Sequence, residues 1–88
     1  MIEEIDETTV GDLDGVRVPM GNVTTGAYTL PDGTTRRGDI CSLVLPDQRV
    51  GVFVGAGSEV VVEGVRWRVL AVDNPTDGLG SVRLQKVD

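Results

Sequence analysis

The C-terminal half of the chain alternates between apolar and polar positions with the two-residue period of β-strands. Three valine-rich runs there are separated by glycine-containing turns: residues 59–62, 65–73 and 81–87. In the second run, Val65, Trp67 and Val69 share one phase, whereas Arg66 and Arg68 occupy the other. Because successive side chains of a strand point to opposite faces of a sheet, this pattern predicts strands with a buried face.

The N-terminal half carries shorter strand signals. Residues 16–18 alternate and stop at Pro19, which predicts an edge strand because proline donates no ladder hydrogen bond. Further strands are expected at residues 23–30, 40–45 and 49–54. Two turns stand out. Residues 30–34 (LPDGT) have the composition of a type I turn followed by a bulge, and residues 63–64 (EG) form a two-residue hairpin loop.

About seven short strands at a spacing of about ten residues are typical of an all-β domain. The composition agrees, since the chain has 16 valines and only three alanines, and valine packs well on a pleated surface. We therefore expect a small barrel or sandwich of six or seven mostly antiparallel strands. Its core should contain the inward-phase residues Trp67, Val69, Val52, Val54 and Leu84.

The net charge of −6 is concentrated at the N-terminus. Residues 1–14 hold six acidic residues and no basic one, whereas acids and bases cancel in residues 15–88. We expect an acidic N-terminal arm over residues 1–14 and a single all-β domain over residues 15–88. The arm would be dispensable for folding, and would act either as a solubility tail or by recognising a basic protein surface. The residues assigned to this contact are Ile2, Glu3, Glu4, Ile5, Asp6 and Glu7.

The residue types that carry most catalysis and metal binding are scarce. The chain has no histidine, which is the commonest general base and metal ligand. Its single cysteine, Cys41, lies between Ile40 and Leu43 on an expected strand, where a buried structural thiol is the ordinary role. Gly55 and Gly57 precede a valine strand rather than the helix that a phosphate-binding loop requires. We therefore assign no catalytic residue, no cofactor and no metal site.

Composition also bears on partners and location. An acidic chain lacks the clustered lysines and arginines that contact phosphates, which argues against nucleic-acid binding. No apolar run approaches the ~20 residues that a membrane span needs. The single cysteine and the absence of a signal-like leader favour a cytoplasmic protein. A protein partner is expected, and a homo-oligomer is compatible with the same pattern.

One combination of motifs spans residues 50–87: Val65-x-Trp67-x-Val69, Val72-Asp73-Asn74 before a glycine loop, and Val82-x-Leu84-x-x-Val87. In this combination the stretch resembles an uncharacterised group of short actinobacterial all-β proteins. The resemblance implies a small all-β domain and a high-GC bacterial source. It implies no activity and no site residues.

Three functions stay open on the sequence. The leading hypothesis is a non-enzymatic accessory or interaction protein that binds another protein through a strand edge or through the acidic arm. The second is a structural ring or connector component of a phage or phage-like particle. The third is a small β-barrel enzyme that shapes an apolar substrate without acid–base residues.

Overall fold

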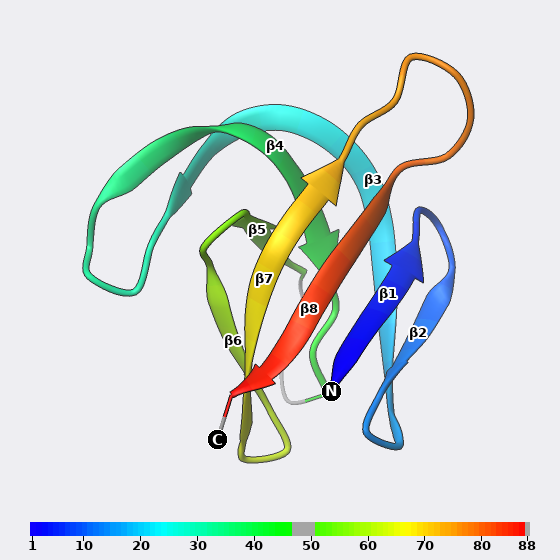
Figure 1. Ribbon diagram of the computed structural model, residues 1–88, viewed down its shortest axis with the longest axis vertical. Coiled ribbons are helices and arrows are strands. Elements are labelled where there is room, and N and C mark those ends of the chain that lie inside the picture. The colour runs from blue at the N-terminus through cyan, green and yellow to red at the C-terminus, as the bar shows by residue number, and fades with distance from the viewer. Residues whose placement is uncertain (47–50, 88) are drawn as a thin grey trace.

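The computed structural model describes residues 1–46 and 51–87, and these residues form eight strands in two antiparallel sheets (Figure 1). The first sheet has the order β1 (Ile2–Asp6), β8 (Ser81–Val87), β7 (Val65–Asp73), β6 (Glu59–Val62). The second has the order β2 (Val10–Leu13), β3 (Val16–Thr29), β4 (Thr35–Leu43), β5 (Val52–Gly55). The predicted all-β class is confirmed. The described residues form two open sheets rather than a closed barrel.

The C-terminal strands follow the sequence prediction closely. β6, β7 and β8 have the predicted bounds, and both predicted turns are present. At residues 30–34 the Gly33 amide donates to the Leu30 carbonyl over 2.9 Å, and Gly33 has the positive φ of 88° that the bulge requires. The predicted strand at residues 49–54 begins at Val52, and its first two positions, residues 49 and 50, lie outside the described residues.

The described residues form eight strands, not six or seven, and two of the predicted strands are joined into one. Residues 16–18 and 23–29 belong to the single strand β3, which continues through Pro19 and carries a bulge between Met20 and Val23. Pro19 is paired with Val10 of β2, three pairs beyond the hydrogen-bonded pair Leu13–Val16 that flanks the turn, so this pair exchanges no ladder hydrogen bonds and the missing N–H costs none in the β2–β3 ladder. Its carbonyl accepts from the Val44 amide over 2.9 Å.

The acidic N-terminal arm is not confirmed as a separate element, because residues 1–14 supply β1 and β2. β1 pairs with β8 in the first sheet, and β2 pairs with β3 in the second. Ile5 and Leu13 are each only 1% exposed and belong to the common core. Most charges of this segment project outward, and Ile5 and Leu13 point inward, whereas Ile2 and Val10 are exposed. Residues 1–14 thus contribute an edge strand to each sheet.

The core between the sheets is aliphatic and is centred on one indole. Trp67, Val69 and Leu84 of the first sheet are buried together with Val54 of the second, as predicted, and Val52 packs against them while partly exposed. The indole Nε1 of Trp67 is buried and has no hydrogen-bond partner among the described residues. Within the same residues, no helix is long and apolar enough to cross a membrane.

Candidate functional site

Each sheet ends in two edge strands, and the chain connects the edges in pairs. β1 and β6 are the edges of the first sheet, and β2 and β5 are the edges of the second. Since β2 follows β1 and β6 follows β5, each pair forms a seam where one edge of each sheet meets the other. We call these the β1–β2 seam and the β5–β6 seam. Edge strands carry unpaired backbone N–H and C=O groups, so a seam is either closed by its own contacts or open to a partner.

The β1–β2 seam is closed by close packing and by hydrogen bonds. Gly11 of β2 lies directly against the Ile5 side chain, and a Cβ at position 11 would overlap it. The Thr9 amide donates to the Asp6 carbonyl over 3.2 Å, and the Thr9 carbonyl accepts from the Met20 amide over 2.8 Å. The turn between the two edges is thereby tied to β3.

Glu7, in this turn, holds two further segments in place. Its carboxylate accepts hydrogen bonds from the Val23 amide at the β3 bulge over 2.8 Å and from the Gly80 amide before β8 over 2.9 Å. The Glu7 amide also donates to the Gly80 carbonyl over 2.9 Å. The hydrogen bonds from Gly80 and Val23 stabilise the ionised carboxylate, so they lower the pKa of Glu7 below its ordinary value of 4.5.

The six residues assigned from the sequence to partner contact do not gather on one surface. Ile5 is in the core, and Glu7 is engaged by Val23 and Gly80. The exposed residues of the six are Ile2, Glu4 and Asp6, which alternate along β1 and so share its outer face. Their assignment to partner contact stays a prediction.

The β5–β6 seam, by contrast, is joined only at its turn. β5 pairs with β4 and β6 pairs with β7, and no ladder connects β5 to β6 in the described part of the chain. At the turn, the Gly55 amide donates to the Ser58 hydroxyl over 3.1 Å, and the Ser58 amide donates to the Gly55 carbonyl over 3.0 Å. The Gly57 amide donates to the Val69 carbonyl over 2.9 Å, which fixes the turn to β7.

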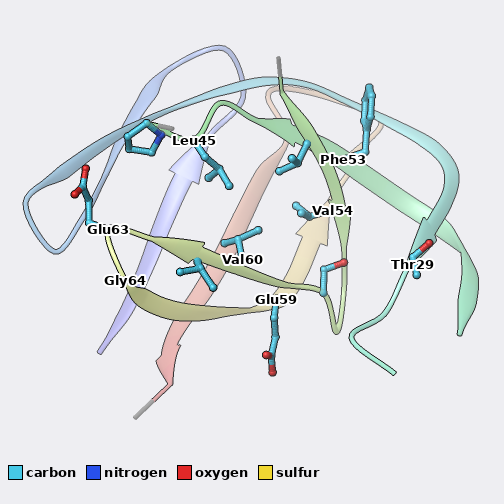
Figure 2. Close-up of a pocket in the computed structure, with 12 residues that line it drawn as sticks. Thr29, Leu45, Phe53, Val54, Glu59, Val60, Glu63 and Gly64 are labelled. Atoms are coloured by element: carbon cyan, nitrogen blue, oxygen red, sulfur yellow. The ribbon is translucent and has the colours of Figure 1, made fainter. Parts of the chain in front are cut away.

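A cavity of about 420 Å³ lies in this open seam (Figure 2). Figure 2 shows Leu45, Val54 and Val60 pointing toward one another across the hollow, whereas Phe53 and Glu59 point away from it. Ligand pockets of proteins span roughly 300–1,000 Å³, so the hollow is large enough to receive a side chain or a small molecule. Its lining combines these aliphatic side chains with polar residues, namely Thr29, Ser58, Glu59 and Glu63.

The charged side chains that line the cavity are both acidic in the described residues. Glu59 accepts a hydrogen bond from the Arg68 guanidinium over 3.2 Å, as expected from their facing positions on β6 and β7. Glu63 forms no hydrogen bond or ion pair within residues 1–46 and 51–87. It is the first residue of the hairpin loop before Gly64, and both have positive φ, 51° and 78°. Within the part of the chain that the structure describes, the lining of the cavity thus includes a carboxylate without a counter-charge.

Beyond the ends of β2 and β5, the β3–β4 hairpin continues as a two-stranded ribbon, residues 25–39. Figure 1 shows this ribbon curving away from the sheets. Its anchor is Tyr28, whose ring lies against Gly55 so closely that a Cβ there would overlap it. The Tyr28 hydroxyl donates to the Ala56 carbonyl over 2.9 Å. The ribbon is therefore attached to the same turn that closes one end of the β5–β6 seam.

The candidates for covalent or metal chemistry are not assembled into a site. Cys41 is fully buried on β4, and burial raises the pKa of its thiol to about 12. A thiol in that state is protonated at neutral pH and is a poor nucleophile. Within residues 1–46 and 51–87, no three acidic or cysteine side chains are placed to hold a metal ion.

Comparisons with protein-family models, with curated proteins and with solved structures give no match for this chain. The open seam was not predicted from the sequence. One local signal for it exists: Phe53 is on the outward phase of its strand and is 61% exposed, as is Val61 on β6 at 52%. Both belong to the edge strands that flank the cavity.

Proposed function

We propose that this chain is a non-enzymatic protein-interaction module that binds a partner by strand addition at the β5–β6 seam. The observation that carries the proposal is the 420 Å³ cavity, with Leu45, Val54 and Val60 on its floor, between two edge strands that belong to different sheets. In β-augmentation, the backbone of an extended segment pairs with an exposed edge, and pockets along that edge accept alternate side chains. The β5–β6 seam offers both parts of such a site.

The alternative of a small barrel enzyme has less support. Its substrate would occupy a closed interior, whereas the hollow lies at an open edge. The titratable groups that line it in the described chain are Glu59 and Glu63, and Glu59 is engaged by Arg68. A cytoplasmic setting agrees with the free thiol of Cys41.

A proline on the β6 edge tests the proposal. Val62 and Val65 flank the two-residue hairpin loop and face one another, so they exchange hydrogen bonds, and the Val61 N–H, one residue earlier, points to the seam. Val61→Pro removes that N–H, whereas Val61→Thr is a matched control that keeps the N–H and the branched side chain.

The probes are three labelled hexapeptides with strand-forming sequences: KVTVKV, TVTVTV and EVTVEV. We expect at least one to bind the full chain, to bind Val61→Thr as well, and to lose binding to Val61→Pro. Fluorescence anisotropy measures the affinity, and amide chemical-shift changes locate the contact. Binding by no peptide, or equal binding to both variants, would overturn the proposal.

A second candidate, a ring or connector component of a particle, is favoured by the β3–β4 ribbon. A two-stranded ribbon is marginally stable in water, and this one is anchored to the domain through Tyr28, so the rest of it would gain stability if a neighbouring subunit covered it. Because ribbon and seam are different surfaces, contact between them in successive copies would be head-to-tail and would generate a ring or a filament. Native mass spectrometry distinguishes the two candidates: one closed stoichiometry above a dimer supports the ring, and a monomer excludes it.

A further inference from the structure

We infer that the β5–β6 seam selects an extended partner segment that carries an aliphatic side chain for the cavity and a lysine or arginine for Glu63. The inference rests on the proposed function and adds the chemistry of the partner. It commits to a segment of another protein rather than to a second copy of this chain.

The apolar part follows from the shape and lining of the cavity. Leu45, Val54 and Val60 form an aliphatic floor that is continuous with the hydrophobic core. In an added strand, side chains alternate between the cavity and the solvent, so only every second residue of the partner enters. The hollow contains no charged group that points into it in Figure 2, since Glu59 is directed outward. A branched aliphatic residue therefore matches it better than a polar one.

The basic part follows from charge. Glu59 is engaged by Arg68, so Glu63 is the carboxylate at the mouth that a partner can neutralise. No lysine or arginine lines the hollow among the described residues, and the whole chain carries a net charge of −6. Charge complementarity at the rim of an interface raises the association rate and excludes partners of like charge.

The backbone at Glu63 supplies a test that separates binding from folding. Both residues of the Glu63-Gly64 loop have positive φ, as a type I′ turn requires, and asparagine is favoured over glutamate at the first position. Glu63→Asn should therefore stabilise the fold while it removes the carboxylate. If Glu63 had only a structural role, its substitution would change the stability of the fold and the binding of the peptide in the same direction.

The experiment uses the full chain and the peptides KVTVKV, TVTVTV and EVTVEV. We expect KVTVKV to bind about tenfold more tightly than EVTVEV at low salt, with the difference reduced at high salt by screening. Replacing its valines, in KTTTKT, should weaken binding about tenfold because the cavity is left unfilled. Glu63→Asn should raise the melting temperature and weaken KVTVKV binding about two- to fivefold. The control Asp77→Asn makes the same charge change at an exposed position of the loop before β8, outside the seam, and should leave binding unchanged.

The outcomes separate this inference from the proposed function. If TVTVTV or EVTVEV binds as tightly as KVTVKV and Val61→Pro abolishes that binding, the strand-addition function stands and the charge selection is wrong. Equal effects of Glu63→Asn and Asp77→Asn on binding would likewise overturn the role of Glu63. If the protein alone forms a dimer that Val61→Pro dissociates and KVTVKV competes with, the occupant is a second copy and the inference is overturned.

Discussion

The β1–β2 seam and the β5–β6 seam are built alike, but only the first is closed. In each, a short turn joins the edge strand of one sheet to the edge strand of the other. In the β1–β2 seam, Gly11 packs on Ile5, and the Glu7 carboxylate accepts hydrogen bonds from the amides of Val23 and Gly80. In the β5–β6 seam, an apolar hollow separates the strands. The same chain therefore uses one seam to hold its sheets together and leaves the other available.

The two seams differ in the segments to which their turns are bonded. The β1–β2 turn is bonded across the seam, to β3 through Thr9 and to the start of β8 through Glu7, so it pulls the two sheets together. The turn at residues 55–58 is bonded to β7, and its Gly55 carries the Tyr28 ring of the ribbon. These contacts fix the turn itself, and among the described residues no ladder joins β5 to β6. The β5–β6 seam is therefore open although its turn, residues 55–58, is held in place by hydrogen bonds.

The largest expected effect follows from breaking the closed seam. Deleting residues 1–12 removes β1 and most of β2, and it should abolish cooperative folding, which is measured by urea denaturation. Ile5→Ala alone should lower the free energy of unfolding by about 2–5 kcal/mol, a large part of the roughly 5–15 kcal/mol available to a small domain. Ile2→Ala on the same strand is the control and should cost little, since Ile2 is 57% exposed. A truncated protein with an unchanged melting temperature would show instead that residues 1–12 are dispensable.

The next-largest effect on stability is expected in the core between the two sheets. Trp67→Ala should cost about 3–5 kcal/mol by emptying the centre of the core. Trp67→Phe should cost clearly less, because it keeps an aromatic ring and also removes a buried N–H that has no partner among the described residues, an arrangement that itself costs about 1–3 kcal/mol. Equal losses for the two variants would mean that Nε1 is satisfied in solution. Tryptophan fluorescence of the native protein should be that of a buried indole.

The comparison also explains which parts of the fold the sequence predicts. β6, β7 and β8 are predicted because alternating valines and glycine turns are local signals, and each strand carries several of them. β1 and β2 are not, because Ile5 and Leu13 are isolated among six acidic residues and only their pairing with β8 and β3 buries them. The state of a seam depends on contacts between distant residues, such as Glu7 with Gly80. Local sequence patterns do not predict contacts between residues that are so far apart in the chain.

Acid should weaken the closed seam through Glu7. Its folded-state pKa is lowered, so the ionised carboxylate adds stability that is fully present above the unfolded-state value and is lost as the pH falls through the folded-state pKa. Glu7→Gln should therefore lower the melting temperature at neutral pH, and the gap between variant and wild type should close below about pH 4. Thermal denaturation between neutral and acidic pH measures this. The control Glu4→Gln removes a charge that accepts neither of these two hydrogen bonds, so it should lower the melting temperature less at neutral pH. If the difference in melting temperature between Glu7→Gln and wild type stays constant with pH, the carboxylate does not have this role.

The smallest effect on stability is expected at the open seam. Phe53 is 61% exposed and points away from the hollow, so Phe53→Ala should change the free energy of unfolding by no more than about 0.5 kcal/mol, as for other exposed positions. The contrast with Ile5→Ala is the measurable difference between an open and a closed seam, and both variants can be compared in one set of urea titrations. A loss above about 1.5 kcal/mol would be typical of a packed aromatic side chain, and would mean that the β5–β6 seam is covered in solution by the protein's own chain or by a second copy. Protein concentration then distinguishes the two cases. The loss of unfolding free energy in Phe53→Ala should depend on concentration if a second copy covers the seam, because association stabilises the folded state by mass action, and should be independent of concentration if the protein's own chain covers it.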